Sequence, residues 1–138
     1  MRTFLTGLTV VAALGLGACS STTGVDIEVR GADKLAADQI VVTGVTQSEL
    51  PDDGGPYDVR THSVTAPEAP RTLGATEDLR IVVDDGLAGK RMDVTVKLLK
   101  AGTAVATGPG AGIIVAGSTK RIRVCFDATG PVGCPATP

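Results

Sequence analysis

The chain has 138 residues, which is enough for one ordinary domain and leaves no room for a second. With 43% hydrophobic and 20% charged residues, 18 Gly and 8 Pro, it is too apolar for a disordered chain and too rich in turn residues for a helical bundle. The net charge of −2, the 2% of aromatic residues and the lack of Trp argue against a nucleic-acid partner, which usually requires a basic surface and stacking rings. We therefore expect a β-rich globular domain that binds no nucleic acid.

The amino terminus has the three parts of a secretory signal. Arg2 supplies the positive charge, residues 4–16 (FLTGLTVVAALGL) are apolar, and small residues precede Cys19. The apolar run is shorter than the roughly 20 residues of a membrane-spanning helix, so residues 1–18 are expected to be removed. Loss of Arg2 leaves 12 basic and 15 acidic residues, a balance of −3.

The end of this signal, Leu16-Gly17-Ala18-Cys19, resembles the bacterial lipobox. The resemblance implies cleavage between Ala18 and Cys19, a diacylglycerol on the Cys19 sulfur, and therefore a membrane partner bound through covalent lipid. Ser20 resembles the signal for the outer membrane of a two-membrane cell, so the implied location is the cell envelope, with the domain facing either side of that membrane. The alternative is a freely secreted protein in which Cys19 is incidental. Residues 19–24 (CSSTTG) then form the lipidated residue and a short tether.

Residues 25–126 contain short runs of alternating apolar and polar residues, separated by Gly, Pro and Asp, as is typical of strands. A turn is expected at 32–38 and a loop at 47–57. Pro residues exclude a central strand at 66–72, so this stretch is expected to be either an edge strand or a crossing loop. The tail 127–138 is predicted to be loop. Strands are expected at 25–30, 39–45, 58–65, 78–84, 91–99, 104–107 with a continuation past Gly108-Pro109-Gly110 at 112–116, and 119–126.

About seven short strands with turns between them predict an all-β fold, an antiparallel two-sheet sandwich of immunoglobulin-like or fibronectin-like type. A small closed β-barrel is the alternative. The stretch 79–108 looks like the Ig-like modules of small bacterial surface lipoproteins, although the Cys…Trp…Cys pattern of true Ig domains is absent. Strand parity predicts this inward-facing set: Val25, Ile27, Val29, Ile40, Val42, Leu79, Ile81, Val83, Val94, Val96, Leu98, Ile122, Val124 and Phe126.

Two cysteines remain beyond the anchor. Cys125 and Cys134 belong to a chain whose signal directs it to an oxidising compartment, so a disulfide between them is expected. Parity places Cys125 on the solvent face of the last strand, where the bridge would hold the tail against the sheet.

The sequence offers little for catalysis or for a cofactor. His62 is the only imidazole, and its neighbour Ser63 points to the opposite face of a strand, so the pair cannot form a catalytic dyad. We therefore interpret His62 as a surface residue. No nucleophile-elbow, zinc-protease, phosphate-loop or dinucleotide motif occurs, and neither an enzyme nor a bound cofactor is expected.

Weaker patterns leave binding roles open. The acidic loops could hold Ca²⁺ only in an arrangement unlike any known calcium loop, and Tyr57 is the one exposed aromatic for a sugar. A cationic interaction face would form if Arg91, Lys97, Arg121 and Arg123 shared a sheet. The acidic residues concerned are Asp52, Asp53 and Asp58 near Glu49, and Asp84 with Asp85.

These features together predict a lipid-anchored, non-enzymatic module of the cell envelope, structural or interacting with an unidentified envelope protein or glycan. The alternatives are a glycan-binding or Ca²⁺-binding surface module and, third, a small enzyme or enzyme inhibitor without a recognisable motif.

Overall fold

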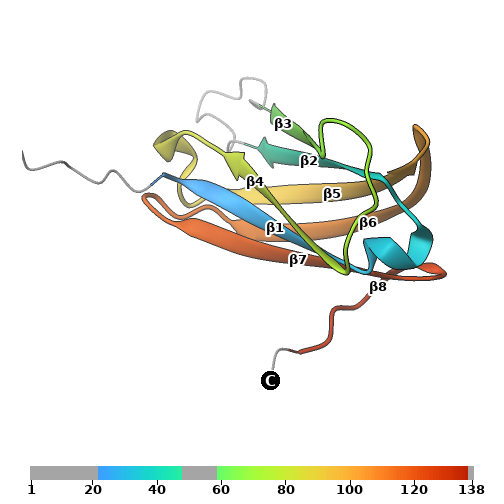
Figure 1. Ribbon diagram of the computed structural model, residues 1–138. Helices are drawn as coiled ribbons and strands as arrows, with labels where there is room; N and C mark the ends of the chain where they lie inside the picture. The colour runs from blue at the N-terminus through green and yellow to red at the C-terminus, as the bar shows by residue number, and fades with distance from the viewer. Residues whose placement is uncertain (1–21, 48–58, 137–138) are drawn as a thin grey trace, which may run out of the picture.

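The computed structural model describes residues 22–47 and 59–136, and it is built almost entirely of strands (Figure 1). Two short 3₁₀ turns, η1 and η2, lie between strands. No helix in these two ranges is long and apolar enough to cross a membrane. The elements are β1 (Gly24–Arg30), η1 (Ala32–Leu35), β2 (Gln39–Gln47), β3 (Val59–Ala66), β4 (Thr76–Val82), η2 (Asp85–Leu87), β5 (Arg91–Lys100), β6 (Thr103–Ile113), β7 (Thr119–Asp127) and β8 (Gly130–Val132).

The strands form two four-stranded sheets that pack face to face. Sheet A has the order β4-β1-β7-β8 and sheet B has the order β3-β2-β5-β6. The predicted sandwich is therefore confirmed, and the alternative of a closed barrel is wrong, because the sheets stay separate throughout the described ranges. One pair differs from the antiparallel prediction, since β1 runs parallel to β7.

Aliphatic side chains from both sheets fill the space between them. All fourteen residues predicted to face inward are buried, which confirms the strand parity. Connecting segments complete this core with Leu73, Leu87 and Ile114. Leu73 and Leu87 lie outside every predicted strand, so alternation could not reveal them. Burial of this apolar surface is the main stabilising contribution to the sandwich.

The expected strand segments 104–107 and 112–116 belong largely to one strand, because β6 runs unbroken through Gly108-Pro109-Gly110 and ends at Ile113. Since β6 is an edge strand, Pro109 removes no hydrogen bond from the middle of a sheet. The glycines meet a packing need: a Cβ on Gly108 would lie 2.9 Å from Val124 Cγ1, and one on Gly110 would lie 2.7 Å from Ile122 Cγ2. Glycine at these positions therefore lets the edge of sheet B approach β7 of sheet A closely.

The tail also differs from its prediction as loop. Residues 130–132 form β8, which extends sheet A by pairing with the end of β7. Asp127 shapes the turn between these strands, because its Oδ1 accepts hydrogen bonds from the backbone N–H (2.7 Å) and the hydroxyl (2.6 Å) of Thr129. Three residues are too few for a recognisable alternating pattern, so β8 could not be predicted from alternation.

Candidate functional site

The four basic residues that were candidates for a single cationic face lie on two different sheets. Arg91 and Lys97 are on β5 of sheet B, whereas Arg121 and Arg123 are on β7 of sheet A. Outward side chains of different sheets point away from each other across a sandwich, so these residues cannot meet one ligand. A single cationic face required all four residues to lie on one sheet, and they do not.

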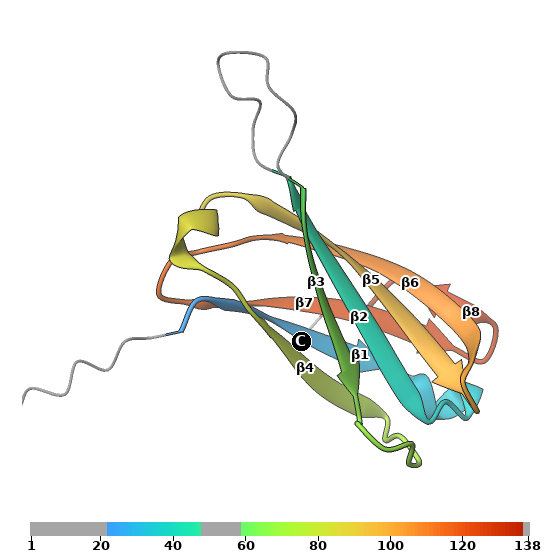
Figure 2. The ribbon, with the colours of Figure 1, turned by 90° about the horizontal axis from the view of Figure 1, so that it is seen from above.

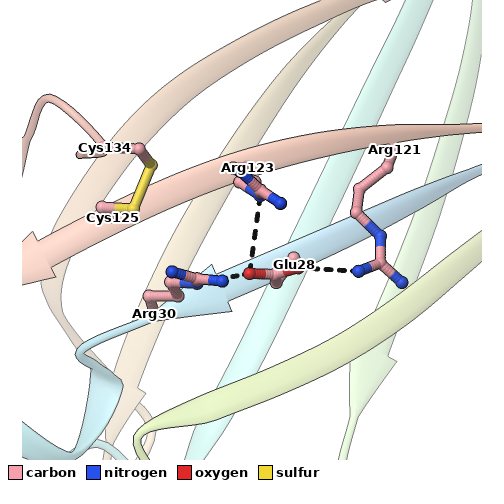
Figure 3. A network of polar contacts seen from close by, with 6 residues as sticks. All are labelled: Glu28, Arg30, Arg121, Arg123, Cys125 and Cys134. Atoms are coloured by element: carbon pink, nitrogen blue, oxygen red, sulfur yellow. Dashed lines mark hydrogen bonds and ion pairs between the residues drawn. A yellow bond between two sulfur atoms is a disulfide. The ribbon is translucent and has the colours of Figure 1, made fainter. Parts of the chain in front are cut away.

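The outer face of sheet A instead carries a network of arginines around one carboxylate, Glu28 (Figure 3). Glu28 is only 3% exposed although it points away from the core. Its Oε2 accepts a hydrogen bond from Arg121 Nη1 at 2.9 Å, and its Oε1 is paired with Arg30 Nε and, at 3.6 Å, with Arg123 Nε. The parallel register brings these groups together, because Glu28 lies opposite Arg123 on β7.

The network keeps the carboxylate ionised. Burial alone would raise the pKa of Glu28, but the hydrogen bond from Arg30 and the charges of Arg30, Arg123 and Arg121 outweigh it, so this pKa lies below its ordinary value. Asp78 lies opposite Glu28 on β4, so two carboxylates stand against three guanidinium groups here and a small excess of positive charge remains. The side chains of Arg30, Arg121 and Arg123 remain 41%, 55% and 31% exposed, so that charge is presented to solvent.

A second ion pair extends this charged face across β1 to β4. Arg80 holds Asp26 in a two-pronged contact, with Nε to Oδ1 at 2.6 Å and Nη2 to Oδ2 at 2.9 Å. This hydrogen-bonded pair, aided by the charges of Arg80 and Arg121, lowers the pKa of Asp26 despite partial burial. We call the set Asp26, Glu28, Arg30, Arg80, Arg121 and Arg123 the arginine–carboxylate face.

The predicted disulfide lies beside this face (Figure 3). Cys125 and Cys134 are bonded, which confirms the pairing. Cys125 has the outward parity that was predicted, yet it is only 5% exposed, so its expected solvent exposure is wrong. The cause is β8, which pairs Val132 with Cys125. Between β6 and the tail lies a groove of about 450 Å³, lined by Pro109, Arg123, Pro131 and the disulfide among others.

His62 is half-buried rather than at the surface. It lies directly opposite Gly44, whose missing side chain would point toward Met92 and Ile81 of the core. His62 therefore shares the inward face of edge strand β3 with Val64, which packs against the core. Its Nε2 has no hydrogen-bond partner among residues 22–47 and 59–136.

Some of the other candidate residues lie within the described ranges and some lie outside them. The candidates that lie outside the described residues are Ala18, Cys19, Glu49, Asp52, Asp53, Tyr57 and Asp58. Asp84 and Asp85 are structural: Asp84 Oδ1 accepts a hydrogen bond from Gly86 N at 2.7 Å, and Asp85 accepts one from the Thr23 hydroxyl. Within the described ranges, no group of three or more His, Cys, Asp or Glu side chains is arranged to hold a metal ion.

Comparison with known proteins identifies no family. No protein-family model matches the chain, and no curated protein matches it. Among solved structures, it is similar to the T6SS lipoprotein TssJ1 from Pseudomonas aeruginosa, at 12% sequence identity and a TM-score of 0.37. That alignment covers 84% of this chain and 99% of the other.

Proposed function

We propose that this protein is a lipid-anchored, non-enzymatic lipoprotein of the cell envelope that serves as a structural or protein-interaction module. The observation that carries the proposal is the sequence Leu16-Gly17-Ala18-Cys19, placed four residues before Thr23, a buried residue at the start of the folded domain. Two or three acyl chains on Cys19 would hold a soluble domain on a membrane, because each buried CH₂ contributes about 0.8 kcal/mol.

The arginine–carboxylate face is the surface that we assign to a protein partner. Its guanidinium groups are held by Glu28 and Asp26, so they lose little freedom when a partner binds. A protein with exposed carboxylates fits it better than a glycan, since sugars commonly stack on aromatic rings. Phe126 is the one aromatic residue in the described ranges, and it is buried.

Metabolic labelling with a radioactive fatty acid tests the anchor. Wild-type protein should carry the label and sediment with membranes, whereas Cys19→Ser should carry none. Ser20→Asp is the matched control: it keeps the acceptor sulfur, so it should stay labelled but move from the outer to the inner membrane fraction. Label on the Cys19→Ser protein would refute the proposal.

Charge reversal tests the partner surface. Arg80→Glu with Arg121→Glu should abolish co-purification of a membrane-derived partner, because both side chains are more than half exposed on the arginine–carboxylate face. Lys97→Glu, on the outer face of sheet B, is the matched control and should leave co-purification unchanged. Equal losses in the two proteins would remove this face from the proposal.

A further inference from the structure

Large exposed apolar side chains are concentrated at the end of the sandwich where β1 begins. Val82, Ile113 and Val115 are 59%, 49% and 51% exposed, whereas Val105 and Val132, toward the opposite end, are 40% and 41% exposed. Val82 lies opposite Gly24, the first residue of β1, and Ile113 lies opposite Arg91, the first residue of β5. We call Val82, Ile113 and Val115 the apolar end.

Thr23 ties the elements of this end together. The carbonyl of Thr23 accepts a hydrogen bond from Val83 N at 3.1 Å, and its hydroxyl accepts one from Gly117 N at 2.7 Å. The same hydroxyl donates to Asp85 in η2. One buried residue therefore fixes β4, η2 and the β6–β7 turn around the start of β1, where Figure 2 shows η2 and that turn at one end of the sandwich.

The apolar end is shaped for contact along the strand axis. Val82 is on the outer face of sheet A and Ile113 is on the outer face of sheet B, because their inward neighbours Ile81 and Ile114 are buried in the core. A partner docked on one sheet would cover only one of them. A flat surface that meets the sandwich end-on would cover both, together with Val115 in the turn.

The length of the preceding chain identifies that surface. Cys19 is four residues before Thr23, so an extended chain separates the two by at most about 14 Å. We infer that the apolar end rests on the lipid bilayer and holds the strands upright on it, an inference that depends on the proposed lipidation of Cys19. Charges of both signs lie at this end, among them Asp84 and Lys120, so apolar contact rather than net charge defines the surface.

Tryptophan fluorescence tests the orientation, because the chain contains no Trp of its own. Ala116→Trp places a reporter in the exposed β6–β7 turn, and Ala104→Trp places a matched reporter at the opposite end. Mature lipidated protein is reconstituted in vesicles of brominated phosphatidylcholine. The emission of Ala116→Trp should be quenched and shifted to shorter wavelength. The emission of Ala104→Trp should show neither quenching nor a shift.

Serine substitutions then test the side chains themselves. In the Ala116→Trp protein, Val82→Ser with Val115→Ser should abolish the quenching while labelled fatty acid remains on Cys19. Val105→Ser with Val132→Ser is the matched control and should leave the quenching intact. Both control residues are exposed apolar side chains away from the apolar end.

Each contrary result has a distinct meaning. Equal emission from the two reporters, with fatty acid present on Cys19, would overturn the end-on orientation and leave the lipoprotein proposal standing. Quenching that falls as protein density in the vesicle rises would assign the apolar end to a second copy of the chain and also overturn the inference. Absence of fatty acid from Cys19 would refute the proposed function and this inference together.

Discussion

The two outer faces of the sandwich are built on different principles. On sheet A, charged side chains pair between strands: Asp26 with Arg80 on β4, and Glu28 with Arg121 and Arg123 on β7. On sheet B, the side chains are mostly uncharged, and the ion pair of Arg91 with Asp93 joins residues of one strand, both more than 60% exposed. The ion pairs of sheet A therefore link neighbouring strands, whereas the ion pair of Arg91 with Asp93 links residues of one strand of sheet B. This difference teaches that similar alternating sequences can produce one outer face with ion pairs between strands and one whose ion pair stays within a strand.

On the inner faces, by contrast, truncation of a buried side chain should lower the stability of the protein by a similar amount on either sheet. Ile81→Ala on sheet A and Val96→Ala on sheet B each remove a buried side chain, and each should lower the free energy of unfolding by about 1–4 kcal/mol. Outward Thr95→Ala should change it by less than about 0.5 kcal/mol. Urea unfolding measures all three. Equal losses at Thr95 and Val96 would mean that the two faces of β5 are not distinguished by burial.

Removal of the disulfide should be the next largest effect. Cys134→Ser opens a loop with a sequence separation of 9, and the chain-entropy estimate gives a loss of about 2.5–3 kcal/mol. The loss should fall on sheet A, because the bridge fixes the tail against β7. Thermal unfolding should show a lower Tm, and hydrogen exchange should increase at β8 but not in sheet B. Two freely alkylated thiols in unreduced wild-type protein would contradict the pairing.

A charge-removing pair of variants compares the outer faces directly. Glu28→Gln leaves three guanidinium groups around a neutral side chain and should lower the free energy of unfolding by about 1–2 kcal/mol. Asp93→Asn, its counterpart on sheet B, should change it by less than about 0.5 kcal/mol, since both members of that ion pair are exposed. Equal losses of stability in the two variants would mean that the ion pairs between strands of sheet A contribute no more than the exposed pair of sheet B.

Acid should weaken the arginine–carboxylate face. The pKa values of Asp26 and Glu28 are lowered in the folded protein, so their stabilisation is present above the ordinary carboxyl values of 3.8 and 4.5 and is lost as pH falls through the lower folded values. Wild-type stability should therefore decline below about pH 4.5. Glu28→Gln should show a shallower decline in pH-dependent urea unfolding, and an unchanged slope would contradict the assigned role of Glu28.

The sequence was sufficient for features that depend on local alternation. Ile27, Ile81 and Val96 could be assigned to the core because each lies in a run with a period of two. The Cys125–Cys134 pairing was accessible for a similar reason, since the two residues are close in sequence and no other cysteine follows the anchor. Parity does not depend on which strands become neighbours.

Features that depend on strand neighbours could not be predicted. Alternation places Arg121 outward but does not say that β7 pairs with β1, so neither the contact with Glu28 nor the separation from Arg91 was visible. Burial of Cys125 required β8, a strand of three residues. His62 was misassigned because the weak strand pattern around it did not identify its inward face.

Intact-mass spectrometry of the mature protein, purified from membranes, tests the central claim most directly. Lipidation at Cys19 predicts a chain that begins at this residue and carries the mass of a diacylglycerol, with an amide-linked acyl chain where the new amine is modified. The disulfide should appear as two hydrogens fewer than the reduced chain. A mature protein whose Cys19 carries no lipid, or a chain that retains residues 1–18, would contradict the account.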